Sequence, residues 1–355
     1  RRMLDTSGVT TYNARATVKD AHHVALSTGE VISAGHILIA TGGLPVRPDQ
    51  PGAELGITSN DIFHLEKLPA SILIIGGGYV ACEFAGIFNG LGSKVTQHYR
   101  GAQILRGFDG EARGMIADQM RDRGVDLHCG TTILAMEKRD DGIWVKSSNG
   151  VEAVYEQVLF ATGRAPNTAG LGLEEAGVEL TESGHIAVNR VARTSRANVY
   201  AVGDCTNFLP LASVSAMQGR TAVFHTMGDV AAPTQLRNVA ANVFTAPEIA
   251  SVGWSQAAIE AGEVLGSIHK IMLEANPRAK MSNIEDGFIK VFASTSGTVI
   301  GGVVVGPKAS ELIYPIALAV ENRLTVDQVA KTFAVYPSLS GSITEAARAL
   351  HIPNV

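Results

Sequence analysis

The feature that most constrains the fold is a glycine-rich turn between an apolar strand-like run and a helix-like segment. Residues 71–75 are rich in isoleucine and leucine, Gly76-Gly77-Gly78 follows, and a helical segment is expected to continue to Gly92. A second apolar run over residues 93–99 completes the order strand, turn, helix, strand that a dinucleotide-binding βαβ unit requires. A bare glycine pattern could be a chance turn, but this order of elements favours a dinucleotide site.

Three positions of this turn have distinct expected roles. Gly76 permits the tight turn, Gly78 lets a pyrophosphate approach the backbone, and Ala81 lets the helix pack closely on the strand. The first turn of the helix would supply N–H groups to the anion.

The end of the second strand indicates which dinucleotide is bound. An NAD site usually places an acid there for the ribose 2′-hydroxyl, but this chain has Gln97-His98-Tyr99-Arg100, and Arg106 follows one short loop later. Two guanidinium groups suit a 2′-phosphate, so the pattern favours NADPH over NADH. The alternative is that Arg100 and Arg106 are ordinary solvated surface charges.

A similar pattern occurs twice in the chain, over residues 36–43 and 157–164. Each copy is a short apolar run that ends in an Ala-Thr-Gly turn, with Ala40, Thr41 and Gly42 in the first copy and Gly163 and Arg164 closing the second. The repetition predicts one kind of nucleotide-binding unit used twice.

A third marker is the run over residues 198–204, which ends in Gly203-Asp204 and precedes a helix expected to begin near Ala212. An Asp at a strand end can accept hydrogen bonds from a polyol, and the helix start can offer N–H groups to an electron-rich ring. Alternatively, Asp204 only caps a helix.

Composition excludes several classes of function. The 355-residue chain allows two or three domains, and its net charge of −5 without a basic stripe makes nucleic acid an improbable partner. No apolar run approaches the 20 or so residues of a membrane span. Three cysteines (Cys82, Cys129 and Cys205) form no paired motif and ten histidines show no ligand spacing, so we expect a cytoplasmic protein without a metal. Because the chain opens on Arg1-Arg2-Met3, we expect the natural N-terminus to lie upstream.

Together these motifs resemble the flavoprotein disulfide reductase family, also called pyridine nucleotide-disulfide oxidoreductases, over nearly the whole chain. The resemblance implies an α/β fold with two Rossmann-like dinucleotide-binding domains and a C-terminal α+β dimerisation domain. It also implies FAD and NADPH as cofactors and a homodimer. The expected domains are residues 1–45 (part of the FAD domain), 46–164 (NADPH-binding), 165–235 (FAD domain continued) and 236–355 (dimerisation).

The resemblance also implies roles for single residues. Asp204 would bind the ribityl chain of FAD, with the turn at Ala40 to Gly43 in the same domain. Tyr79 would cover the flavin until nicotinamide enters, and Glu83 would lie near the site of hydride transfer. Arg100 and Arg106 match the pair that glutathione reductases use for the 2′-phosphate.

One departure from the family concerns its opening flavin-binding GxGxxG turn and its redox-active CxxxxC pair. Both should precede residue 1, and neither occurs in this sequence. A flavin-binding sheet without its first central strand would expose apolar faces, so truncation is favoured over loss of the unit.

The second departure concerns the acid/base pair. Disulfide reductases end in a His-Pro motif followed by Glu, whereas this chain has Tyr336-Pro337 and Gly341 at those positions. A phenol ordinarily has a pKa near 10 and shuttles protons poorly at neutral pH. This ending resembles bacterial NAD(P)H quinone reductases, which implies electron transfer from NADPH through FAD to a small-molecule acceptor. Two alternatives are a glutathione-reductase-like or lipoamide-dehydrogenase-like disulfide reductase, in which Tyr336 is only a packing substitution, and a non-catalytic dinucleotide-binding pseudoenzyme.

Overall fold

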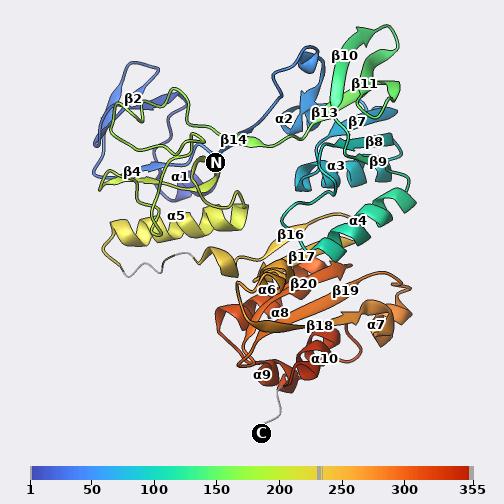
Figure 1. Ribbon diagram of the computed structural model, residues 1–355. Helices are drawn as coiled ribbons and strands as arrows, with labels where there is room; N and C mark the ends of the chain where they lie inside the picture. Colours follow the sequence, from blue (N-terminus) through green and yellow to red (C-terminus); the bar gives the residue numbers. More distant parts are fainter. Residues whose placement is uncertain (1, 230–232, 234, 352–355) are drawn as a thin grey trace. The chain divides into compact units, whose positions relative to one another are not determined.

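The computed structural model describes residues 2–229, 233 and 235–351, and the chain forms two compact units (Figure 1). Unit 1 comprises Arg1–Leu44 and Arg164–Leu236, and unit 2 comprises Pro45–Gly163 and Arg237–Val355. The expected domains begin at residue 1 and end at residue 355, and both ends lie outside the described residues. The chain therefore crosses between the units near residues 45, 164 and 236.

Unit 2 is built around a parallel five-stranded sheet. Its strand order is β6 (Ile57–Thr58), β13 (Gln157–Phe160), β7 (Ser71–Ile75), β8 (Lys94–Tyr99) and β9 (Asp126–Cys129). Helices α3 (Tyr79–Gly90) and α4 (Gly110–Asp122) make the crossovers from β7 to β8 and from β8 to β9. Ile72, Leu73 and Ile74 of the central strand are fully buried, as a sheet covered on both faces requires. The predicted α/β class is confirmed.

A small antiparallel sheet covers part of this core. It consists of β10 (Ile133–Arg139), β11 (Gly142–Ser147) and β12 (Glu152–Tyr155), and the short elements η1 (Ala53–Leu55) and α2 (Ser59–Ile62) lie earlier in the chain. Met136, Val145 and Tyr155 pack with Leu73 and Phe160 of the parallel sheet.

The C-terminal part of unit 2 is an antiparallel sheet with helices, here called the C-terminal sheet. Its order is β16 (Ala241–Val243), β17 (Glu248–Gly253), β20 (Val299–Gly306), β19 (Phe288–Ser294) and β18 (Gly266–Met272). The helices of this part are α6 (Gln256–Glu260), α7 (Pro277–Met281), α8 (Ala309–Glu321), α9 (Val326–Lys331) and α10 (Gly341–Ala349), with the short turns η3 (Leu236–Asn238) and η4 (Leu273–Ala275).

Both faces of the C-terminal sheet are buried, and β19 shows how. Phe288 and Phe292 join a core that includes Ile116 of α4, whereas Ile289 and Val291 join one that includes Ile316 of α8. Side chains alternate between the faces of a strand, so one face meets α8 and α10 and the other meets α4 (Figure 1). Within unit 2, the parallel sheet and the C-terminal sheet therefore share a continuous core.

Unit 1 holds a parallel pair, β4 (Ile37–Ile39) beside β15 (Val199–Ala201), followed by η2 (Gly203–Cys205) and α5 (Ala212–Thr226). Its other elements are α1 (Arg2–Thr6), the antiparallel sheet of β1 (Ala16–Val18), β2 (His23–Leu26) and β3 (Val31–Ser33), and the paired strands β5 (Gly43–Pro45) and β14 (Arg164–Pro166).

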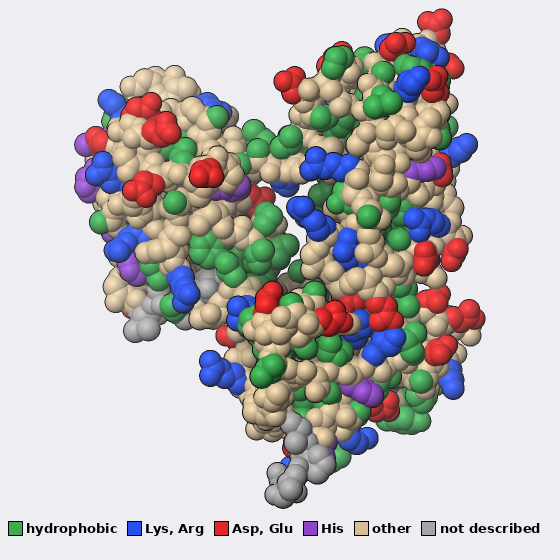
Figure 2. All heavy atoms as spheres, in the orientation of Figure 1, with side chains coloured by type: hydrophobic (Ala, Val, Ile, Leu, Met, Phe, Trp, Pro, Cys, Tyr) green, Lys and Arg blue, Asp and Glu red, His purple; other side chains and the backbone are tan. Residues whose placement is uncertain are grey.

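The surface carries both signs of charge. Figure 2 shows basic and acidic side chains interspersed over the visible face of each unit. Among the described residues, no helix is both long and apolar enough to cross a membrane.

His98 is a buried polar group on β8, where it is 1% exposed. Its Nδ1 lies 3.1 Å from the hydroxyl of Ser147, and its ring meets that of His128 edge-on at 5.2 Å between centroids. Burial, reinforced by His128, lowers the pKa of His98 from 6.5 to about 4. The folded protein therefore holds this imidazole neutral.

This burial predicts a pH dependence of stability. The unfolded chain takes up a proton near pH 6.5 and the folded chain only near pH 4, so the stabilisation is complete above pH 6.5 and is lost as the pH falls through about 4. Relative to the parent, His98→Asn should gain up to roughly 3 kcal/mol between these limits as the pH falls. Thermal unfolding from pH 4 to 7.5 measures this, with exposed His64→Asn as the control. Parallel curves for parent and His98→Asn would contradict it.

Candidate functional site

The glycine turn follows the carboxyl end of the central strand β7. Gly76 has φ +146°, and a side chain there would fall on the carbonyl group of Ala161, just beyond β13. Only glycine satisfies both constraints. A Cβ at Gly78 would meet nothing within 4 Å, and no described side chain caps α3, whose N-cap is Gly78. The turn thus leaves open space beside a helix N-terminus, which fits a dinucleotide pyrophosphate.

Two residues that the sequence analysis missed brace this turn. Gln97, which is fully buried on β8, donates a hydrogen bond from Nε2 to the carbonyl oxygen of Gly76 at 2.9 Å. The backbone N–H of Leu105 donates to the carbonyl oxygen of Gly77 at 2.6 Å. Ala81 is fully buried under the turn. A glutamine within an apolar strand was the available signal for Gln97, whereas nothing in the sequence marked Leu105.

Tyr79 and Glu83 lie one turn apart on α3. Tyr79 is the first residue of the helix and is 40% exposed. Glu83 Oε1 accepts a hydrogen bond from the backbone N–H of Phe244 at 2.8 Å, just after β16. Burial raises the pKa of the Glu83 carboxyl, and this hydrogen bond opposes the rise. Glu83 therefore links α3 of the parallel sheet to the C-terminal sheet, a role that the sequence did not reveal.

Arg100 and Arg106 flank the loop that leaves β8. Both are exposed, and within the described part of the chain neither guanidinium forms a hydrogen bond or an ion pair. Buried Ile104 and Leu105 hold the middle of the loop against the core. Two cationic groups thus remain available for an anionic ligand beside the glycine turn.

In unit 1, the two predicted flavin-binding segments leave adjacent parallel strands. The N–H of Val202 donates to the carbonyl oxygen of Ile39 at 2.9 Å, so Ala40 to Gly43 and Gly203-Asp204 emerge at the same edge. Arg164 joins them, since its Nη2 donates to the carbonyl oxygen of Gly43 at 2.6 Å and its Nε lies 3.6 Å from Asp204 Oδ2. The structure therefore brings Arg164 and Asp204 together at Gly43, the residue that follows Gly42.

Asn167 and Gln218 complete this arrangement and were not predicted. Asn167 donates from its backbone N–H to the carbonyl oxygen of Gly42 at 2.9 Å and from its side chain to that of Thr41 at 3.2 Å. Gln218 Oε1 accepts from the N–H of Gly203 at 2.9 Å. Helix α5 begins at Ala212 without a side-chain cap from the described residues. The partly exposed carboxylate of Asp204 suits the polyol of a flavin, and the uncapped start of α5 suits its ring. Gly163 belongs to unit 2, where its carbonyl oxygen accepts from the N–H of Val46 at 2.9 Å.

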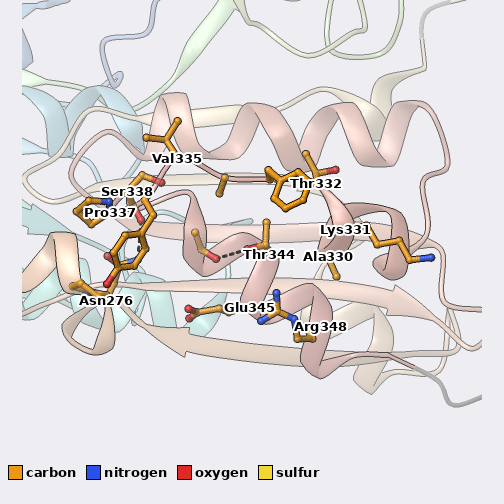
Figure 3. A pocket seen from close by; sticks show the side chains of 15 residues that line it. Asn276, Ala330, Lys331, Thr332, Val335, Pro337, Ser338, Thr344, Glu345 and Arg348 are labelled. Atoms are coloured by element: carbon orange, nitrogen blue, oxygen red, sulfur yellow. Dashed lines mark hydrogen bonds between the residues drawn. The ribbon is translucent and has the colours of Figure 1, made fainter.

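Tyr336 and Gly341, which depart from the disulfide reductase pattern, line an open pocket of about 460 Å³. Tyr336 is 82% exposed there, and Gly341 begins α10. Lys331, Glu345 and Arg348 also line the pocket, and Figure 3 shows the last two side chains projecting from α10. The side chain that stands in the position of the family's histidine is thus a solvent-exposed phenol.

Two cysteines are unsuited to thiol chemistry. Cys82 and Cys205 are fully buried, and burial raises the pKa of the Cys82 thiol to about 12. A buried protonated thiol is a poor nucleophile.

Known proteins resemble the chain over almost its full length. The family model described as pyridine nucleotide-disulphide oxidoreductase matches residues 1–219, and that of the family's dimerisation domain matches residues 239–347. An NAD(P)H dehydrogenase (quinone) of Mycobacterium tuberculosis is 43% identical over 97% of this chain and 69% of its own length. A glutathione reductase of Burkholderia cepacia is 40% identical over 96% of this chain and 76% of its own length. The crystal structure of LpdA from Mycobacterium tuberculosis superposes with a TM-score of 0.91 and 40% identity, covering 99% of this chain and 79% of that one.

A methyl group added at either outer glycine of the turn should have a different effect: at Gly78 it should weaken nucleotide binding, and at Gly76 it should lower the stability of the fold. Gly78→Ala should change the free energy of unfolding by less than about 1 kcal/mol, because φ there is −83° and the space is open. It should nevertheless raise the Kd for NADP⁺ at least about tenfold, because the methyl group blocks the pyrophosphate. Gly76→Ala should cost about 2 kcal/mol or more in stability. Calorimetry measures the Kd for NADP⁺, and urea unfolding measures the stability. Unchanged NADP⁺ affinity in a folded Gly78→Ala protein would refute the placement of the pyrophosphate at this turn.

Proposed function

Because the chain belongs to the pyridine nucleotide-disulphide oxidoreductase family, whose members use FAD and NAD(P)H, we propose that it passes hydride from NADPH to FAD and electrons on to a quinone or similar small acceptor. The observation that carries the choice of acceptor is the C-terminal motif. Tyr336 and Gly341 stand where a disulfide reductase needs its histidine and glutamate.

Reduction of a disulfide requires a proton for the leaving thiolate, and an acid with a pKa near neutrality supplies it. An exposed phenol does this poorly, and a glycine cannot orient a base. Transfer of electrons to a quinone makes no such demand on the protein. The quinone-reducing relative, 43% identical, supports this choice, whereas the 40% identical glutathione reductase supports the rival reading.

Each cofactor is assigned its own set of residues. We assign residues 46–164 to NADPH, with Gly76, Gly78 and Ala81 forming the pyrophosphate turn and Arg100 and Arg106 binding the 2′-phosphate. Residues 1–45 and 165–235 are assigned to FAD. Their ligand-binding residues would be Ala40, Thr41, Gly42, Gly203, Asp204 and Ala212. Gly163 and Arg164, at the end of the NADPH range, are also assigned to cofactor binding. When bound, FAD supplies the redox chemistry, and the protein positions its ring and its substrates.

Tyr79 and Glu83 are assigned to the entry of nicotinamide. The aromatic ring of Tyr79, at the start of α3, would cover the flavin ring until the nucleotide enters. Glu83, one turn further along, would fix the helix through its hydrogen bond to Phe244 and keep Tyr79 in position.

We further propose that the protein is a cytoplasmic homodimer assembled through residues 236–355. The match to the family's dimerisation domain supports this, as do the exposed side chains of Phe333 and Val335, which are 101% and 79% accessible. Its three cysteines are unpaired, as in a reducing compartment.

Cofactor choice can be tested at the two arginines. Arg100→Ala combined with Arg106→Ala should raise KM for NADPH at least about tenfold, because two charge-assisted contacts are lost, and change KM for NADH less than about twofold. Steady-state kinetics with both nucleotides measures this. Equal effects on the two cofactors would defeat the assignment.

Acceptor choice can be tested by comparing a benzoquinone with oxidised glutathione and lipoamide. The purified flavoprotein should oxidise NADPH with the quinone at least about a hundredfold faster than with either disulfide, since the acid that disulfide exchange requires is missing. Comparable rates would favour the disulfide reductase. A colourless protein that fails to oxidise NADPH even with a quinone present would support the pseudoenzyme.

A further inference from the structure

Lys290 is a buried cation that the proposed reaction does not use. Its side chain is 3% exposed and lies on β19 of the C-terminal sheet. Its ammonium group lies 3.0 Å from both carboxylate oxygens of Asp109, 3.0 Å from Glu111 Oε2 and 2.8 Å from Gln256 Oε1. Asp109 is equally buried, at 3%. Burying charges is costly unless they are fully paired, and here the acceptors surround the ammonium group.

The partners of Lys290 mark the start of α4. Lys290 lies two residues from both Phe288 and Phe292 and so shares their face of β19, the side that packs on this helix. Asp109 is the N-cap of α4, and its Oδ1 accepts from the N–H of Ala112 at 3.0 Å. One carboxylate therefore both caps the helix and receives the lysine, so the C-terminal sheet fixes the point at which α4 begins.

The loop that ends at this cap carries the two arginines assigned to NADPH. Its middle is tied to the glycine turn by the hydrogen bond from Leu105 to Gly77. Arg113 of α4 also holds this loop. Its Nε donates to the carbonyl oxygen of Ile104 at 2.6 Å, and its Nη2 donates to that of Gln103 at 2.7 Å. Arg106 lies between two fixed points, the Leu105 contact and the Asp109–Lys290 pair.

We propose that Lys290 is a positioning residue for the 2′-phosphate of NADPH. It acts through Asp109 and the loop to hold Arg106 ready for the phosphate, so that binding orders little of the chain. This inference rests on the proposed role of Arg100 and Arg106. Without Lys290, the buried carboxylate of Asp109 loses its cation, the start of α4 loosens, and Arg106 must be ordered each time a nucleotide binds.

The test measures binding by calorimetry on the FAD-loaded full-length protein, with adenosine 2′,5′-bisphosphate and adenosine 5′-diphosphate as probes. Lys290→Met should raise the Kd of the 2′-phosphorylated probe at least about fivefold and that of the other less than about twofold. Lys270→Met is the matched control, because Lys270 also contacts Glu111, at 2.6 Å, but lies on the more exposed strand β18. It should shift either Kd less than about twofold.

A double-mutant cycle separates positioning from general damage. If Lys290 acts through Arg106, Lys290→Met should have no further effect on the 2′-phosphorylated probe in an Arg106→Ala background. Equal weakening of both probes, or an undiminished effect in that background, overturns the proposal. If Arg106→Ala alone leaves the Kd unchanged, the phosphate assignment fails and this inference fails with it. Should Lys290→Met not fold, Asp109→Asn, which keeps a capping group and loses the charge, must give the same pattern.

Discussion

The close approach of Gly76 to the carbonyl group of Ala161 is the contact on which the site in unit 2 depends. It brings the carboxyl ends of β7 and β13 together and starts α3 at the sheet edge, where parallel α/β sheets bind ligands. Gln97 and Leu105 donate hydrogen bonds to the carbonyl oxygens of Gly76 and Gly77. The open space at Gly78 therefore belongs to a rigid turn, so a ligand meets amide groups already in place.

The C-terminal sheet holds the helices that pack on the parallel sheet. It shares a core with α4, its Phe244 amide binds Glu83 of α3, and its Lys290 neutralises the cap of α4. Helices α3 and α4 are thus both held by the C-terminal sheet. A buried ion pair adds little net stability relative to an apolar pair, but its loss on one side costs about 3–5 kcal/mol, which makes it a device for fixing geometry.

The elements that the sequence predicted are those determined by local pattern. Strand β7 occupies Ser71–Ile75, the residues expected from their apolar run, whereas α3 ends at Gly90, two residues before the expected Gly92. Contacts between distant segments carried no such signal. Two ion pairs, Arg164 with Asp204 and Lys290 with Asp109, depend on tertiary packing. No periodicity in the sequence reveals either pair. Substitutions at Tyr336 and Gly341 were visible only against a family pattern.

The central claim is that one chain binds NADPH at the glycine turn and FAD at the Asp204 edge, and that electrons pass between the two cofactors to an acceptor that needs no thiol. Anaerobic spectroscopy of the purified flavoprotein tests it most directly. Addition of one equivalent of NADPH should bleach the flavin absorption, and a benzoquinone should restore it with every cysteine alkylated beforehand. A flavin that NADPH does not bleach, or that only the unalkylated protein can return to the oxidised form, would contradict the account.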